Sequence, residues 1–250
     1  MNDSISTISP AWPTRWPKDS FKSPWTWVLA AIIAAIFVSG FVLGLKNGNN
    51  ASMKGLSPLI IDVSLVLTMC IEGVPMLVVL LALPSLSKFT LRELGFRVPT
   101  GTVVATAVLG SIAMAIVADG GASLIGYLAH SQHQQDVIAV FESLHDKTTI
   151  AIFSIFAIVV APVIEETLFR VFFFNLGLRY GGFWTGAIVS GVLFGVAHGD
   201  LFALVPLAAG GMILCYVYYR TRNAFASMIS HALFNSFSIA ALLFFPQVSK

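Results

Sequence analysis

Six polar side chains lie within or at the ends of strongly apolar segments, and their types are those that hydrolysis requires. A charge near the centre of a bilayer costs about 3 kcal/mol on insertion scales, so such groups usually face the protein interior and contact one another. We therefore expect the six residues to share one cavity. They are Glu165, Glu166, Arg170, His198, His231 and Asn235.

Helical spacing divides the charged residues of the first segment into two roles. Glu166 and Arg170 are four positions apart, so they lie on one face of a helix and can form an ion pair. Glu165 is five positions from Arg170, which places it about 140° away around the helix. The spacing predicts a structural pair between Glu166 and Arg170 and leaves Glu165 as the candidate general base.

The histidines complete a set of groups that could hydrolyse an amide bond. His231 and Asn235 are four positions apart and project to one side of their helix, whereas His198 belongs to another helix. A carboxylate with an imidazole can activate water, and an imidazole with a carboxamide can donate hydrogen bonds to a developing oxyanion. No Ser/His/Asp or Cys/His set that would supply a covalent nucleophile is evident.

Two alternatives stay open. Glu165, His198 and His231 could hold a zinc ion with an open position for water. The sequence has no His-Glu-x-x-His signature, so we favour a mechanism without a metal or another cofactor. The second alternative has no catalysis: buried charges also lock helices together or relay ions, and the chain would then be a membrane immunity protein or a small-solute transporter.

The elements that must position these residues are transmembrane helices. The chain has 250 residues, of which 57% are hydrophobic and 10% are charged, whereas soluble domains are about 25% charged. This composition predicts an all-α polytopic bundle in a membrane, and the net charge of +2 does not indicate a nucleic-acid partner. We expect about seven spans, with the cavity among the fourth, fifth and seventh, at residues 25–45, 58–83, 102–128, 148–178, 183–198, 201–219 and 224–245.

The expected domain organisation is a short N-terminal segment followed by one transmembrane domain. Residues 1–24 are rich in Pro and Trp and suit an interfacial or cytoplasmic position, and residues 25–250 form the domain. The long fourth span should tilt, bend at Pro162 or project beyond the bilayer. Three histidines of the polar loop 129–147 should be solvated. Cys70 and Cys215 lie in apolar segments, where we expect buried thiols and no disulfide.

Basic residues favour a cytoplasmic N-terminus. With seven spans, the loops on the N-terminal side hold nine of the 14 Lys and Arg residues and the opposite loops hold four. Positively charged loops stay in the cytoplasm, so the N-terminus is predicted there. The nine are Arg15, Lys18, Lys22, Lys88, Arg92, Arg97, Arg179, Arg220 and Arg222, and the four are Lys46, Lys54, Lys147 and Lys250.

The polar residues fall into three motifs. The segment from Glu165 to Arg170 fits E-E-x-x-x-R, Phe194-Gly-Val-Ala-His fits F-x-x-x-H, and His231-Ala-Leu-Phe-Asn fits H-x-x-x-N. In this order and spacing they resemble the CPBP family of intramembrane peptidases, the CAAX protease and bacteriocin-processing group, which includes the type II CAAX prenyl endopeptidases. The linker at residues 94–99 is also similar to the segment that often precedes the core in bacterial members. The resemblance extends over residues 84–245.

The resemblance implies an intramembrane endopeptidase of a bacterial plasma membrane, acting on a peptide or protein substrate that can itself be membrane-associated. It implies that Glu165 is the catalytic base, that His198 helps to activate water, and that His231 with Asn235 forms the oxyanion site. The predicted ion pair matches motif positions that support the site. Members of the family have been described both as zinc-dependent and as glutamate-dependent, so the resemblance leaves the cofactor open.

Overall fold

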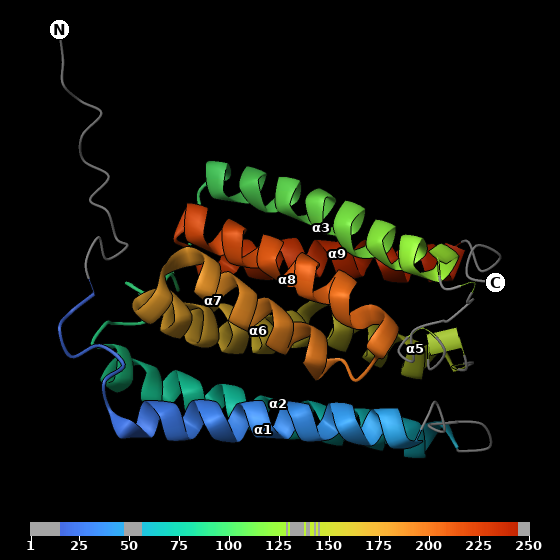
Figure 1. Cartoon of the computed structure of the whole chain (residues 1–250). Coiled ribbons are helices and arrows are strands. Elements are labelled where there is room, and N and C mark those ends of the chain that lie inside the picture. Colours follow the sequence, from blue (N-terminus) through green and yellow to red (C-terminus); the bar gives the residue numbers. More distant parts are fainter. Residues whose placement is uncertain are drawn as a thin grey trace, which may run out of the picture.

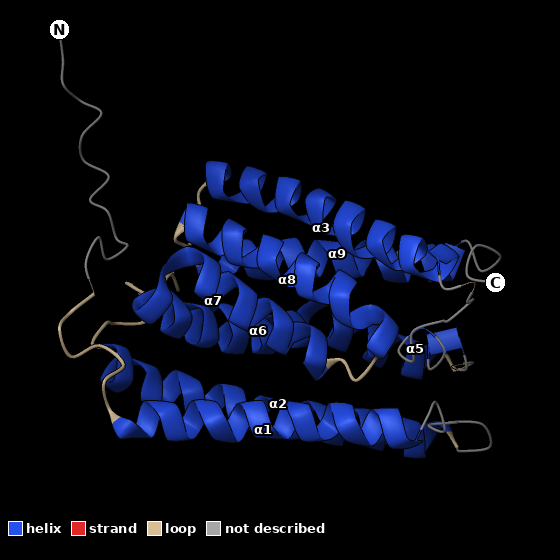
Figure 2. Cartoon of the chain, viewed as in Figure 1, coloured by secondary structure: helices blue, strands red, loops and turns tan. Residues whose placement is uncertain are grey.

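The protein is a bundle of long helices. The computed structural model describes residues 16–47, 57–128 and 146–244, together with 130, 138, 141, 142 and 144. Every regular element of this part of the chain is helical, which confirms the expected all-α class (Figure 2). The helices are α1 (Pro24–Asn47), α2 (Pro58–Ser87), α3 (Gly101–Leu128), α5 (Lys147–Ile155), α6 (Ala161–Glu166), α7 (Asn175–Ala197), α8 (Leu201–Thr221) and α9 (Ala224–Phe244), with π-helical stretches η1 (Phe156–Val160) and η2 (Thr167–Phe174).

The helices run roughly along one direction and form layers (Figure 1). Helices α1 and α2 lie on one side of the bundle, α3 lies on the opposite side, and α6 to α9 lie between them. The π-helical stretch η2 contacts α2, α7, α8 and α9, and all eight of its residues are buried. The segment that carries the charged motif is therefore the central helix of the bundle, which explains why its other side chains are so apolar.

Within the part of the chain that the structure describes, five helical segments are long and apolar enough to cross a membrane, and α2 contributes a shorter apolar stretch, Gly73–Ser87. The protein is an integral membrane protein. The five are Pro24–Leu43, Gly101–Leu128, Lys147–Ala197, Leu201–Thr221 and Ala224–Phe244. The third of them contains the fourth and fifth predicted spans, and non-helical backbone at Gly182, with φ 77° and ψ −171°, separates the two arms.

Glycines hold the two arms of this hairpin in close contact. A Cβ on Gly177 would lie 2.6 Å from Gly186 Cα, and one on Gly186 would lie 2.6 Å from the carbonyl oxygen of Phe174. Farther from the bend, the hydroxyl of Ser190 donates a hydrogen bond of 2.7 Å to the carbonyl of Phe169. This close packing places the arm with the F-x-x-x-H motif directly against the arm with the two glutamates.

The long fourth span passes through Pro162 without a break. Proline has no amide hydrogen and its ring crowds the carbonyl four residues earlier, so an α-helix usually kinks there. Here the wider turns of η1 immediately precede α6 and accommodate the proline. The second wide stretch, η2, begins at Thr167, whose hydroxyl donates 2.7 Å to the carbonyl of Val163. Such π-helical turns are rare and occur frequently at functional sites.

Some local expectations are confirmed and one is wrong. The linker between α2 and α3 buries Leu94, exposes Arg92 and consists of turns. Cys215 is buried, as expected. Cys70, on α2, is exposed, so the expectation of a buried thiol is wrong there. Of the three loop histidines, His130 is exposed, and the other two lie outside the described residues.

Four segments that carry basic residues lie at one end of the bundle, the left end in Figure 1. They are the N-terminal segment before α1, the linker between α2 and α3, the bend of α7 and the turn between α8 and α9. The N-terminal segment contacts the end of α2, where Phe21 N donates to Leu86 O at 2.6 Å. The hydroxyl of Tyr180, near the bend of α7, donates to Phe21 O at 3.1 Å. The linker contacts the start of α9, where Ala224 N donates to Gly95 O at 2.9 Å. We propose that this end faces the cytoplasm, because basic loops stay there.

An impermeant maleimide should label a cysteine at this end only from the cytoplasmic side. In a Cys70→Ser background, Lys88→Cys should react in inside-out vesicles and Lys147→Cys in right-side-out vesicles; both lysines are exposed, and Cys215 is buried. Mass spectrometry of the labelled protein provides the measurement. The opposite pattern would reverse the orientation.

Candidate active site

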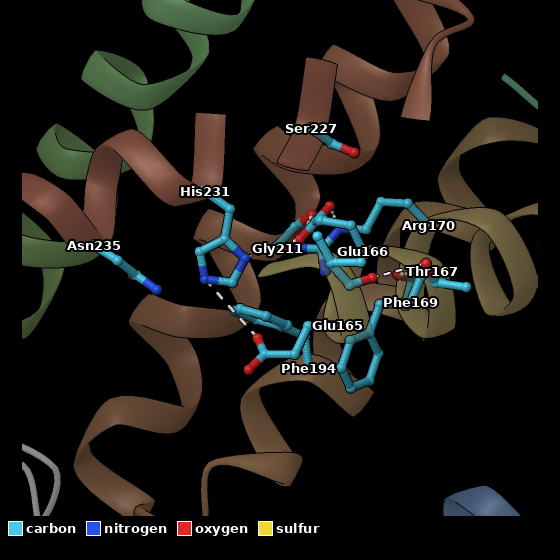
Figure 3. Close-up of polar contacts among 12 residues, drawn as sticks. Glu165, Glu166, Thr167, Phe169, Arg170, Phe194, Gly211, Ser227, His231 and Asn235 are labelled. Atoms are coloured by element: carbon cyan, nitrogen blue, oxygen red, sulfur yellow. Dashed lines mark hydrogen bonds and ion pairs between the residues drawn. The ribbon is translucent and has the colours of Figure 1, made fainter. Parts of the chain in front are cut away.

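Four ionisable side chains form a continuous chain of contacts in the middle of the bundle. Arg170 Nε lies 3.1 Å from Glu166 Oε2, and Glu166 Oε1 lies 3.0 Å from His231 Nδ1. On the other side of the imidazole, His231 Nε2 lies 3.9 Å from Glu165 Oε2 (Figure 3). The two carboxylates thus contact opposite nitrogens of one histidine that arrives from a different helix.

The arginine end of this chain is fully enclosed. The side chains of Glu166 and Arg170 are both 0% exposed, so the predicted i, i+4 ion pair is confirmed and is a buried one. The guanidinium also donates from Nη2 to the carbonyl of Gly211 at 3.3 Å, and its Cζ lies 4.5 Å from the centroid of the Phe194 ring. A buried charge needs such compensation, because its desolvation costs several kcal/mol.

Glu166 fixes the orientation and the tautomer of His231. A carboxylate paired with arginine only accepts hydrogen bonds, so His231 Nδ1 carries the hydrogen and donates it to Glu166. In the neutral imidazole Nε2 is then an acceptor, and it faces Glu165. Their separation of 3.9 Å is too long for a direct hydrogen bond and suits one bridging water. Glu165 is 23% exposed, compared with 4% for the His231 side chain, so it is the accessible end of the chain.

Phe194 is the apolar centre of the site. Its buried ring lies 4.7 Å from the His198 ring and 5.6 Å from the His231 ring, measured between centroids, and it also covers the guanidinium of Arg170. A ring face attracts a desolvated cation, so this contact stabilises the arginine. In the sequence, Phe194 is only the first letter of a motif. Nothing in its spacing indicates that it contacts three of the polar residues.

Asn235 lies on the same side of α9 as His231, as the four-residue spacing predicts (Figure 3). Its Nδ2 donates a hydrogen bond of 2.7 Å to the carbonyl of Ala157 in η1. A carboxamide nitrogen has two hydrogens, so this bond leaves one more donor. The bond also ties α9 to the wide turn that precedes the glutamates.

His198 lies at the C-terminal end of α7 and is exposed. Its Nδ1 donates to the carbonyl of Phe194 at 2.7 Å, which makes Nε2 the acceptor in the neutral ring. Gly199, with φ 70°, and Asp200 follow at once and form a tight turn. The Asp200 carboxylate accepts from the amides of Phe202 and Ala203 and caps α8. His198 contacts the same Phe194 ring as His231 but is not part of the four-residue contact chain.

Zinc is the alternative that the sequence leaves open. In the described part of the chain, no three His, Cys, Asp or Glu side chains are grouped so that they could hold a metal ion, and this includes the three residues nominated for zinc, Glu165, His198 and His231. The metal-free mechanism stays a prediction and zinc its alternative, and chelation of the active protein can distinguish them.

Residues 147–237 match the family model described as type II CAAX prenyl endopeptidase Rce1-like. The chain is 27% identical over 169 residues to "Putative membrane peptidase YdiL" of Bacillus subtilis (strain 168), a match that covers 66% of each protein. It is 32% identical over 108 residues to "Membrane-embedded CAAX protease MroQ" of Staphylococcus aureus (strain USA300), which covers 40% of this chain and 43% of that one.

The matches span just under two thirds of the Bacillus protein and less than half of the Staphylococcus protein. No solved structure matches the chain. The matched family segment begins with α5 and ends within α9, so it contains every residue of the contact chain. These findings confirm the resemblance found in the sequence: the chain is a membrane protein that is similar, over residues 147–237, to the Rce1-like type II CAAX prenyl endopeptidases.

Proposed function

We propose that the protein is an intramembrane endopeptidase that hydrolyses a peptide bond with a water molecule activated by Glu165. One observation carries this proposal: the contact chain from Arg170 through Glu166 and His231 ends at the partly exposed Glu165. A purely structural charge cluster would need only the buried pair. The additional imidazole, held in one tautomer and turned toward a second carboxylate, is the arrangement that general-base chemistry requires.

In the proposed reaction, the water bridges Glu165 and His231 Nε2. It donates one hydrogen to each of them, and its oxygen attacks the carbonyl carbon of the substrate while Glu165 takes a proton. The second N–H of Asn235 donates to the oxyanion that develops. The tetrahedral intermediate then collapses, the C–N bond breaks, and Glu165 returns its proton to the leaving amine. One water is consumed, and one carboxylic acid and one amine are formed.

This assignment changes the role that the resemblance implies for His231. With Nδ1 bound to Glu166, the neutral ring presents an acceptor at Nε2, so it aligns the water rather than donating to an oxyanion. His198, whose Nε2 is likewise an acceptor, is a second group that can orient the water or bind the peptide beside the Phe194 ring.

The proposed substrate is a peptide or protein segment that reaches the membrane, and the proposal assigns no particular sequence to it. The matched family is described as a CAAX prenyl endopeptidase, and MroQ is described as a CAAX protease. A farnesylated CAAX peptide is therefore the first probe to use, alongside peptides released from membranes of cells that express the protein.

Reconstituted full-length protein should cleave such a peptide, and His231→Gln should lower the rate by at least about 100-fold, because the water loses its aligning acceptor. His130→Gln, at an exposed histidine, is the matched control and should keep full activity. Mass spectrometry in H₂¹⁸O measures the product, whose new carboxylate should contain one ¹⁸O.

The same assay with a chelator, followed by zinc, tests the metal alternative. If activity disappears with chelation and returns with zinc, the protein needs zinc and the metal-free mechanism is wrong.

The alternative function, a non-catalytic immunity protein or transporter, predicts a different result. No peptide would be released, and His231→Gln would leave membrane peptide profiles unchanged. A charge relay also needs only ionisable groups, so it gives no reason for the orientation of His231 toward Glu165.

A further inference from the structure

Four hydrogen bonds join the linker between α2 and α3 to the last turn of α8, the α8–α9 turn and the first residue of α9. Tyr218 Oη donates to Leu94 O at 2.7 Å, and Ala224 N donates to Gly95 O at 2.9 Å. Arg97 makes the remaining two bonds, one as an acceptor and one as a donor. Asn223 Nδ2 donates to Arg97 O at 2.9 Å, and Arg97 Nη2 donates to Arg222 O at 2.7 Å.

The linker backbone is shaped for this contact. Gly95 has φ 103°, a conformation that other residues rarely adopt, and a Cβ there would lie 2.8 Å from Ala224 N. Asn223 also accepts a hydrogen bond of 2.9 Å from Phe225 N through Oδ1, so the same residue caps α9 and holds the linker. The linker therefore fixes the first turn of α9.

The same network reaches the helix that carries the glutamates. Asn175, the first residue of α7 directly after η2, donates from Nδ2 to the hydroxyl of Tyr218 at 2.8 Å and to the carbonyl of Val171 at 3.0 Å. Asn175 and Tyr218 are fully buried. A continuous path thus runs from Val171, next to Arg170, through Asn175 and Tyr218 to Leu94, and the linker continues it to the start of α9.

Small movements of α9 would disturb the active-site contacts. His231 is seven residues from the start of the helix, so it lies about 10 Å along its axis. If the imidazole is roughly 6 Å from that axis, a rotation of about 10° displaces it by about 1 Å. A displacement of this size can cost about 100-fold in rate. The histidine must keep one nitrogen at Glu166 and the other at Glu165, so it is sensitive to rotation in either direction.

We propose that Tyr218 and Arg97 are positioning residues that set the rotation of α9 and thereby hold His231 between the two glutamates. We call this network, comprising residues 94–97, Asn175, Tyr218 and 222–224, the linker clamp. Its catalytic consequence rests on the proposed function, whereas its effect on the orientation of His231 does not.

The test compares Tyr218→Phe with Tyr216→Phe in the full-length protein. The first variant removes only the oxygen that joins Asn175 to the linker and keeps the ring against Phe174. Tyr216 is an exposed tyrosine of the same helix and provides the control. Histidine-selective ¹⁵N NMR follows the tautomer of His231, because the chain has five histidines and His231→Gln identifies its signals.

Tyr218→Phe should convert the Nδ1–H signal of His231 into a mixture of tautomers and lower kcat about tenfold with KM unchanged. Tyr216→Phe should change neither. Arg97→Lys keeps the charge but cannot reproduce the guanidinium contact, and it should show the same changes; it decides the question if Tyr218→Phe does not fold. Arg92→Lys, in the exposed part of the linker, is its control.

Unchanged tautomer and kcat in both clamp variants would overturn the proposal. If the tautomer shifts in the clamp variants but the wild-type protein cleaves no peptide, the clamp stands and the proposed function fails. A fall in kcat with an unchanged His231 tautomer would also contradict the clamp, because the lost activity would then have another cause.

Discussion

Glu165→Gln should lower the rate of peptide hydrolysis by about 1,000-fold and leave the fold intact. The amide has nearly the same shape as the carboxylate but cannot take a proton from water, and positioned general bases contribute about 10²- to 10⁴-fold. Glu165 lies at the accessible end of the contact chain and is not part of the buried ion pair, so the neutral side chain should be tolerated. Rates on a cleavable peptide and thermal unfolding in detergent are the two measurements.

Asp119→Asn is the matched control for this variant. Asp119 is a carboxylate of α3 that is exposed, and its replacement should leave activity unchanged. If Glu165→Gln retained more than about a tenth of wild-type activity, Glu165 would not be the base, since that role contributes far more. One of the two histidines would then have to act as the general base.

Arg170→Met should destabilise the protein far more than Glu165→Gln does. It leaves Glu166 as a fully buried carboxylate without its cation, and removing one partner of a buried pair costs about 3–5 kcal/mol in the free energy of unfolding. The double variant Glu166→Leu/Arg170→Met removes both charges and should recover part of that loss, because apolar side chains of similar volume often replace a buried pair well. Thermal unfolding of the purified protein measures both.

Activity separates the two roles of this pair. The double variant should remain inactive even where stability returns, because His231 Nδ1 then has no carboxylate to hold its tautomer. Arg92→Met, at an exposed arginine of the linker, should be close to wild type in both measurements. An Arg170→Met variant as stable as that control would show that the pair is not structurally important.

Local spacing made part of the site predictable. The apolar runs predict the helices to within a few residues; the last one is Ala224–Phe244, for example, against an expected 224–245. The pairing of Glu166 with Arg170 depends only on the geometry of one helix. Likewise, the sharing of one side of α9 by His231 and Asn235 follows from their spacing, and the structure shows it.

Contacts between distant segments were not predictable in the same way. The bond between Glu166 and His231 joins residues 65 positions apart, and it depends on the rotation of α9 against α6. The wide turns of η2 depend on how the surrounding helices pack, since Thr167 to Phe174 has no sequence signature of a π-helix. The roles of Gly95 and Tyr218 appear only once the linker lies against the α8–α9 turn.

The separation of Glu166 and His231 in the sequence has a consequence for biosynthesis. Ribosomes add about 5–20 residues per second, so His231 emerges about 3 to 13 seconds after Glu166. During that interval the α6–α7 hairpin can insert and pair Glu166 with Arg170, but Glu165 has no imidazole beside it. If Glu165 and His231 act as proposed, the nascent chain therefore inserts into the membrane before its hydrolytic site is complete. Neighbouring unfolded segments would meet the active site only after α9 has docked.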